Sequence, residues 1–250
     1  MEALAKGWPD SKVRVGPPPD DGQPFIVWGQ IWLAEQIIPK ALKQGRKFWQ
    51  IDNGFYKSAR GTPIGYYRFM YSRPDPVYLD RPDLHDLRMA DKALKMPWAG
   101  WRQEGEYVLY AVPGPDLGKA FGVDVPTWCI GAEQRIRAAT ARPVRVRSRT
   151  SPRPLAEDFT NCWAVVTHSS NVAVDAVIGG LPAFVEPTSP TAPLGNLSLR
   201  NLDHPTLASR DELDAWWASL MCQQFSVGEM ASGVAHKYLS AVAEQEETRR

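Results

Sequence analysis

The alternation of strand-like and helix-like patterns restricts the fold more than any other feature of this sequence. Residues 107–190 follow the order strand, helix, strand, helix, strand, helix, strand. A shorter unit precedes them, in which the apolar runs Phe25–Gly29 and Lys47–Asp52 flank a segment with helical spacing that ends at Gly45. Because a strand, a crossover helix and a second strand form a parallel pair, both stretches predict open α/β sheets.

A chain of 250 residues fits one large domain or two small ones. We expect two α/β domains, residues 1–106 and 107–250, since the second alternation begins where the irregular stretch 53–106 ends. One helix is predicted near Leu84–Leu94. Further along, Ser209 and Glu212 have the spacing of a capping box and predict a helix start there.

Several classes of protein are not expected. No apolar run approaches the roughly 18 residues of a membrane span, and the N-terminal residues lack the apolar core of a signal peptide. The three cysteines, Cys129, Cys162 and Cys222, are odd in number and far apart, which fits neither a disulfide framework nor a zinc site. These observations favour the cytoplasm.

Positive charge is concentrated in the first part of the chain. The net charge is +1, but residues 1–153 hold 24 Lys and Arg against 16 Asp and Glu, and residues 154–250 hold 5 against 12. The imbalance indicates an anionic partner for the first part, or only an uneven distribution of solvated side chains.

Motif searches exclude several chemistries. The sequence has no phosphate-binding G-x-x-x-x-G-K-[ST] loop, no G-x-G-x-x-G after a strand, no G-x-S-x-G elbow and no H-E-x-x-H. It also has no D-x-D, which argues against a nucleotide-sugar site clamped by a metal ion. A departing diphosphate would then be stabilised by protein donors.

A run of hydrogen-bonding side chains lies between an apolar strand and a predicted helix. A helix cap requires only one such residue, and hydroxyl and backbone N–H groups at a helix start bind anions. The run therefore favours a phosphate site over capping alone, with Asp175 placed for a ribose hydroxyl. The alternative is a capped helix with Asp175 facing solvent. The members of the run are Thr167, His168, Ser169, Ser170 and Asn171.

Arginines alternate along the predicted strand 142–150. Arg145, Arg147 and Arg149 would point to one face, where three guanidinium groups require an anion or carboxylates. Diphosphate is a natural partner at the end of such a strand. The alternative is an edge strand whose arginines are solvated.

The N-terminal part offers an acceptor site. Asp52 ends an apolar strand and can act as a general base, or merely cap an Asp-Asn-Gly turn. In the stretch Tyr66–Pro74, aromatic residues alternate with arginine, a pattern typical of stacking on bases with contacts to phosphate, or of an aromatic core segment. Tyr66, Tyr67 and Arg68 are the acceptor-binding residues expected there, together with Asn53.

The segment from Arg142 to Pro187, containing "RPVRVRSR" and "THSSNVAVDAVIGGLPAFVEP", resembles the C-terminal half of GT-B-fold glycosyltransferases of the capsule-polysaccharide and phage-encoded type. "FIVWG", "FWQIDNGFY" and "YYRFMYS" resemble the N-terminal half of uncharacterised phage proteins in this group, and "FSVGEMASGVAHKYL" resembles its closing helix. Those proteins carry histidine where this chain has Asn53, so the chain departs from their Asp-His-Gly-aromatic turn directly after Asp52.

The resemblance implies a GT-B-like α/β fold of two Rossmann-like domains with a trimmed N-terminal domain. It implies metal-independent transfer of a sugar from a nucleotide sugar, with UDP favoured and no further cofactor. The acceptor it suggests is the hydroxyl of 5-hydroxymethylcytosine in double-stranded phage DNA, modified in the host cytoplasm. Arg147, Arg149, the run Thr167–Asn171 and Asp175 would bind the donor, with Asp52 as base.

Two other functions stay open. A capsule or lipid-linked polysaccharide transferase would associate with a membrane and bind no DNA. A non-catalytic nucleotide-binding or DNA-binding module would use Asp52 for stability alone.

Overall fold

Both predicted alternations form sheets in the computed structural model, which describes residues 1–29, 33–56, 65–71, 96–114 and 123–248. The chain divides into two compact units, and each contains one four-stranded sheet. Unit 1 comprises Met1–Pro74 and Gln223–Arg250, and unit 2 comprises Asp75–Cys222. The fold is mixed α/β with two Rossmann-like units, as predicted. The helix expected near Leu84–Leu94 lies outside the described residues.

The sheet of unit 1 is parallel on one side and antiparallel on the other. Its strands lie in the order β1 (Phe25–Trp28), β2 (Phe48–Asn53), β3 (Tyr66–Tyr71) and β8 (Gln224–Ser226). β1 and β2 are parallel and joined through α2 (Leu33–Lys43), whereas β3 and β8 are antiparallel additions. Only the first half of this sheet is Rossmann-like, which agrees with a trimmed N-terminal domain.

The apolar residues of α2 recur at the predicted helical spacing and pack the helix against this sheet. Its small and branched residues Ala34, Ile38 and Ala41 are buried against Val27 of β1 and Phe48 of β2. Pro39 lies inside the helix, on its exposed side. One apolar stripe thus binds the helix to the parallel strand pair.

The division differs from the predicted boundary at residues 106 and 107. The C-terminal segment belongs with the N-terminal unit because β8 pairs with β3, and Phe69 N donates to Gln223 O at 2.9 Å. The predicted closing helix is instead β8 followed by two helices, α9 (Val227–Ala231) and α10 (Val234–Thr248), with Gly233 at φ +84° between them. Sequence periodicity could not reveal this pairing, because it depends on contacts between residues more than 150 positions apart.

The charge imbalance is smaller when it is counted over the structural units. Unit 1 carries 14 Lys and Arg against 10 Asp and Glu, and unit 2 carries 15 against 18. The difference falls mainly because residues 75–153, which hold 13 Lys and Arg against 10 Asp and Glu, belong to unit 2. Net charge per unit therefore gives weaker support to an anionic partner than the linear count did.

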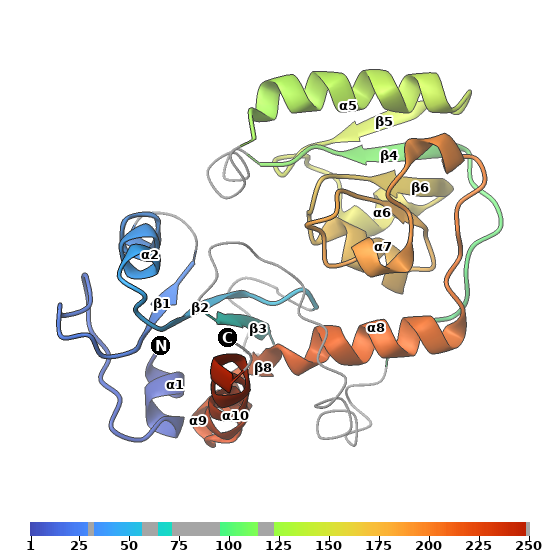
Figure 1. The fold of residues 1–250 in the computed structure, drawn as a ribbon. Helices are drawn as coiled ribbons and strands as arrows, with labels where there is room; N and C mark the ends of the chain where they lie inside the picture. The colour runs from blue at the N-terminus through green and yellow to red at the C-terminus, as the bar shows by residue number, and fades with distance from the viewer. Residues whose placement is uncertain (30–32, 57–64, 72–95, 115–122, 249–250) are drawn as a thin grey trace. The chain divides into compact units, whose positions relative to one another are not determined.

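The sheet of unit 2 is entirely parallel. Its strands lie in the order β5 (Val144–Arg147), β4 (Tyr107–Ala111), β6 (Cys162–Val166) and β7 (Ala183–Phe184). The helix α5 (Val125–Ala139) covers one face, and the short helices α6 (Leu155–Phe159) and α7 (Val172–Ile178) lie on the other (Figure 1). This two-sided cover explains why β4 is buried at every position.

One hydrophobic core of unit 2 lies between α5 and the sheet. It contains alternate residues of the central strands with two residues of the helix, and their burial fixes which face of each strand points to α5. The buried members are Val108, Tyr110, Ala132, Ile136, Ala164, Val166, Phe184 and Leu202.

The helix α8 (Arg210–Cys222) begins at the predicted capping box. Ser209 Oγ accepts from Glu212 N at 3.3 Å, and Glu212 Oε2 accepts from Ser209 N at 2.7 Å. A second box, which was not predicted, opens α9 with Ser226 and Glu229. Among the described residues, no helix is both long and apolar enough to cross a membrane.

Candidate functional site

The order of strands in unit 2 reverses at β4 and β6. The chain passes from β4 to β5 on one side and then returns to β6 on the other side of β4. Parallel sheets bind ligands where the strand order reverses in this way. The loop Thr167–Asn171 directly follows β6 and therefore lies at this edge.

Thr167 connects the ends of three strands. Its hydroxyl donates to Ala111 O of β4 at 2.8 Å, and its backbone N–H donates to Phe184 O of β7 at 3.0 Å. The side chain is buried. Thr167, predicted to bind the donor, thus uses its hydroxyl proton to fix the edge of the sheet.

His168 is buried beside an aromatic ring. Its ring meets Trp128 of α5 edge-on with centroids 5.1 Å apart, and Nδ1 lies 3.2 Å from Ser169 Oγ. Burial lowers the pKa of His168 below its ordinary value, and the charge of Glu186 opposes that shift. A neutral imidazole carries a single N–H, at Nδ1 or at Nε2.

The rest of the loop is half-exposed at the start of α7. Ser170 Oγ accepts from Val172 N at 3.3 Å, whereas Asn171, which occupies the cap position, makes no side-chain bond to the helix end. Capping therefore involves Ser170 and does not account for the whole polar run.

Asp175 lies one turn into α7, among the buried residues Val174 and Ala176. Burial raises the pKa of its carboxyl to about 6. The predicted ribose ligand is therefore a carboxyl that changes protonation close to neutral pH, which is frequent at functional sites.

A second polar loop, not predicted from the sequence, follows β7 at the same edge. Glu186 N donates to His168 O at 3.0 Å and joins the two loops. Ser189 and Thr191 are buried, and Thr188 Oγ1 is buried without a hydrogen-bond partner in the described part of the chain. The sequence could have indicated this loop through its position directly after a predicted strand, because the carboxyl ends of adjacent parallel strands meet at one edge of a sheet.

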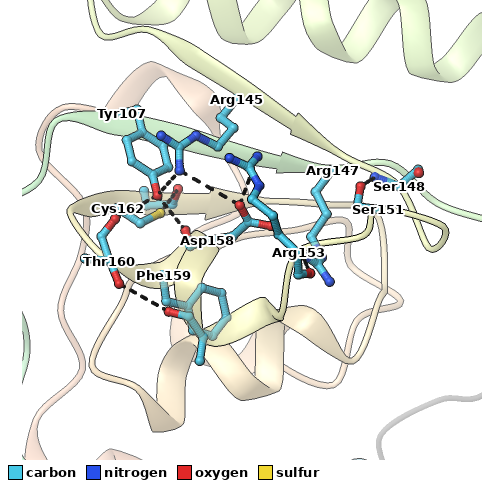
Figure 2. A network of polar contacts seen from close by, with 12 residues as sticks. Tyr107, Arg145, Arg147, Ser148, Ser151, Arg153, Asp158, Phe159, Thr160 and Cys162 are labelled. Atoms are coloured by element: carbon cyan, nitrogen blue, oxygen red, sulfur yellow. Dashed lines mark hydrogen bonds and ion pairs between the residues drawn. The ribbon is translucent and has the colours of Figure 1, made fainter.

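The arginines of β5 point to one face, as alternation predicted, and they meet a carboxylate there (Figure 2). Arg147 Nη1 forms a hydrogen bond and ion pair with Asp158 Oδ2 and also donates to Arg153 O at 2.9 Å. Arg145 Nη1 lies 3.9 Å from Asp158 Oδ1, and Arg153 Nη2 lies 3.2 Å from it. Asp158 is almost completely buried.

This pairing changes the interpretation of the predicted diphosphate ligands. The side chain of Arg147 is only 15% exposed and serves Asp158. Arg149 lies beyond the strand, which ends at Arg147, in the turn Arg149–Thr150, so it does not belong to the alternating face. Asp158 was missed, although an arginine-rich strand followed by a short acidic helix signals internal charge pairing.

In unit 1 the register of β2 and β3 brings four predicted residues together. Asp52 pairs with Arg68, and Asn53 pairs with Tyr67. Asp52 Oδ2 accepts from Arg68 Nη2 at 3.0 Å, and Asp52 Oδ1 accepts from Asn53 N at 2.7 Å. The proposed base is thus held at both oxygens.

Arg68 is buried over the ring of Phe55, with 4.5 Å between its guanidinium carbon and the ring centroid. Burial lowers the pKa of Arg68, and Asp52 opposes that shift. Arg68 Nε has no hydrogen-bond partner among the described residues. The guanidinium therefore orients Asp52 from the neighbouring strand.

The two predicted tyrosines have different neighbours. Tyr67 contacts the half-exposed Trp28 of β1 at 5.4 Å between ring centroids, and Tyr66 contacts Tyr56 at 6.1 Å. Tyr67 and Trp28 form an aromatic surface at the end of β1 and β3. The described residues contain no cluster of three or more His, Cys, Asp or Glu side chains suited to a metal ion.

Comparison with solved structures includes a distant likeness. The chain is similar to the KpsC beta Kdo 2,4 transferase of Thermosulfurimonas dismutans, with a TM-score of 0.46, 12% identical residues and 78% of each chain covered. No protein-family model matches the chain. No curated protein matches it either.

Proposed function

We propose that this chain is a glycosyltransferase that transfers a sugar from a nucleotide-sugar donor, preferably a UDP-sugar, to a hydroxyl group. The observation that carries the proposal is the pair of polar loops, Thr167–Asn171 and Glu186–Thr191, at the strand-order reversal of a parallel sheet. The resemblance of the segment 142–187 to GT-B-fold enzymes supports the same assignment.

On the donor side, the half-exposed Ser169, Ser170 and Asn171 supply donors for the diphosphate at the start of α7. His168 supplies an N–H, and the carboxyl of Asp175 accepts from a ribose hydroxyl. The buried Thr188 hydroxyl, which lacks a partner among the described residues, is a further donor toward a ligand at this edge. These groups stabilise the departing diphosphate without requiring a divalent ion.

On the acceptor side, Asp52 takes the proton of the acceptor hydroxyl. The hydroxyl oxygen then bonds to the anomeric carbon, while the bond from that carbon to the phosphate oxygen breaks and the nucleoside diphosphate leaves with the electron pair. Arg68 and the backbone N–H of Asn53 hold the carboxylate in place. Tyr67 and Trp28 offer a surface for the ring of the acceptor.

The first acceptor to test is 5-hydroxymethylcytosine in double-stranded DNA, which the resemblance to phage proteins suggests. A surface polysaccharide is the second. The protein is incubated with each acceptor and UDP-, GDP- and CMP-sugars, and the products are identified by mass. A sugar adduct on either acceptor supports transferase activity and identifies the acceptor. Absence of an adduct with every pair contradicts the proposal.

The donor site is tested separately by thermal unfolding with UDP, GDP and CMP. A ligand that binds only the native state raises the midpoint. We expect UDP to raise it in the wild type, and the double variant Ser169→Ala and Ser170→Ala to lose most of that rise while unfolding near the wild-type midpoint. The matched control is Ser232→Ala, which removes an exposed hydroxyl in unit 1. An unchanged rise in the double variant would contradict the assigned loop.

A further inference from the structure

We propose that Arg145 and Arg153 form a binding site for a phosphate group on the face of the unit 2 sheet covered by α6. This site uses different residues from the loops at the ends of β6 and β7. The sequence predicted an anion or carboxylates beside Arg145, but only the structure shows that Arg147 is already engaged by Asp158 and that Arg153 joins the cluster.

The charge balance of the cluster is the first argument. Three guanidinium groups, those of Arg145, Arg147 and Arg153, surround the single carboxylate of Asp158 (Figure 2). Arg147 is the most buried of the three and makes the hydrogen-bonded pair with Asp158. The other two charges lack a carboxylate of their own, so the cluster attracts an anion.

The second argument is that the two remaining arginines are accessible and held in place. The side chains of Arg145 and Arg153 are 37% and 51% exposed. Arg145 Nη1 and Arg153 Nη2 both approach the same carboxylate oxygen, Asp158 Oδ1. Among the described residues, that oxygen accepts no hydrogen bond of normal geometry. The two guanidinium groups therefore flank one point, and a single tetrahedral anion can reach both.

Tyr107 fixes the position of Arg145. The guanidinium carbon lies 3.7 Å from the ring centroid, and Nη1 donates to Tyr107 Oη at 2.8 Å. Burial raises the pKa of Tyr107, so its hydroxyl retains the proton. The hydroxyl lies 2.8 Å from Asp158 O and 2.7 Å from Thr160 O, which anchors it to the end of α6.

The unused donors define the ligand. Among the described residues, Arg145 hydrogen-bonds only through Nη1, and Arg153 pairs only through Nη2, which leaves the other guanidinium nitrogens of both side chains for a ligand. Two guanidinium forks match the oxygens of a phosphate group, with which they form charge-assisted bonds. The phosphate comes either from the diphosphate of a nucleotide or from a free phosphate or pyrophosphate.

Inorganic pyrophosphate is the probe, measured by calorimetry at constant ionic strength. Arg145→Gln and Arg153→Gln are each expected to weaken binding about tenfold, the loss of a charge-assisted contact. The matched control is Arg137→Gln, which removes an exposed arginine of α5 that pairs with Glu133. If the wild type binds no pyrophosphate, or if both variants bind it as tightly as the wild type, the site is wrong.

A competition between pyrophosphate and UDP distinguishes the two sources. If UDP displaces pyrophosphate, the phosphate is that of the nucleotide; if both bind together, the site takes a separate phosphate. Either result supports the site, and neither depends on sugar transfer, so failure of the proposed function is recognised separately.

The variant Asp158→Asn gives an independent measurement, because it leaves three guanidinium groups without their carboxylate. We expect this variant to unfold at a lower temperature than the wild type and to gain a larger midpoint rise from pyrophosphate. An equal rise in both proteins would overturn the proposal, because the excess charge would then not bind the anion.

Discussion

The two units differ in how many cations surround their partly or fully buried carboxylates. In unit 1, Asp52 faces one guanidinium, that of Arg68 on the adjacent strand. In unit 2, Asp158 faces three, while Asp175 is paired with no cation in the described part of the chain. The number of cations per carboxylate distinguishes the three cases. Asp52 forms a balanced pair, Asp158 lies in a cluster with excess positive charge, and Asp175 is a carboxyl that titrates near neutral pH.

Topology explains the difference. In unit 1 the antiparallel register places Arg68 directly opposite Asp52, so the two charges pair across one strand boundary. In unit 2 the arginines alternate along a parallel edge strand, and their partner comes from the helix that follows. The five-residue helix α6 supplies one carboxylate, that of Asp158, to two arginines of β5 and to Arg153. The cluster therefore has more positive than negative charges.

The largest effect is expected from Asp52→Asn. If Asp52 is the base, the variant keeps its fold and loses about 10²- to 10⁴-fold in transfer rate, because general base catalysis contributes that much. The measurement is initial rate with the donor and acceptor identified by the product assay. Asp20→Asn is the control, since Asp20 is an exposed carboxylate of unit 1 with an ion pair to Lys40. Full activity of the Asp52→Asn variant would show that the pair of Asp52 and Arg68 has only a structural role.

Asp158→Asn tests the comparison through stability. Removing one partner of a buried ion pair costs about 3–5 kcal/mol, and three guanidinium groups lose their carboxylate here. The 22% exposure of Asp52 lets water replace part of its pairing, so Asp52→Asn is expected to cost less. Urea unfolding followed by circular dichroism measures both free energies. Equal losses would show that the number of cations around a carboxylate does not set its contribution.

The fold was largely predictable because its signals are local. Apolar runs and helical spacing gave the order of elements, and the box at Ser209 and Glu212 marked the start of α8. The strand β3 lies in the stretch 53–106 that was predicted to be irregular, because its aromatic residues and arginines show no regular strand pattern. The pairing of β8 with β3 was not predictable, because the energy of that contact comes from residues more than 150 positions away.

The sequence predicted where the candidate site lies better than it predicted the hydrogen-bond and ion-pair partners of its residues. Alternation placed Arg145 and Arg147 on one face, and the strand order placed Thr167–Asn171 at a sheet edge. A sequence does not show which carboxylate satisfies an arginine, so Asp158 and Arg153 were missed. It also gave no reason to expect the Thr167 hydroxyl to bond Ala111 O rather than a ligand.

Asp175→Asn is expected to change how stability depends on pH. The folded pKa of about 6 lies above the ordinary aspartate value of 3.8, so the folded state binds this proton more tightly than the unfolded chain. The stability that Asp175 contributes is complete below the unfolded pKa and is lost as pH rises through 6. The asparagine variant has no such loss.

The two proteins should therefore have similar free energies of unfolding near pH 4, and the variant should be more stable at pH 7.5, by on the order of 3 kcal/mol. Urea titrations at four pH values give the difference curve. Any contribution of His168 is shared by both proteins and cancels in that difference. A flat difference would mean that Asp175 is better solvated than its burial indicates.

The smallest expected effect is the loss of stability when either of the two capping boxes, one in each unit, is removed. Ser209→Ala and Ser226→Ala each remove a hydroxyl that accepts a backbone N–H, which costs about 1 kcal/mol at a helix start. Ser209 is exposed, whereas Ser226 is half-buried and also lies at the end of β8, so its loss affects a strand and a helix together. We expect Ser226→Ala to cost more, measured by urea unfolding. If Ser209→Ala costs as much, the junction of β8 and α9 adds nothing to the cap, and the return of the chain to unit 1 depends on β-strand pairing alone.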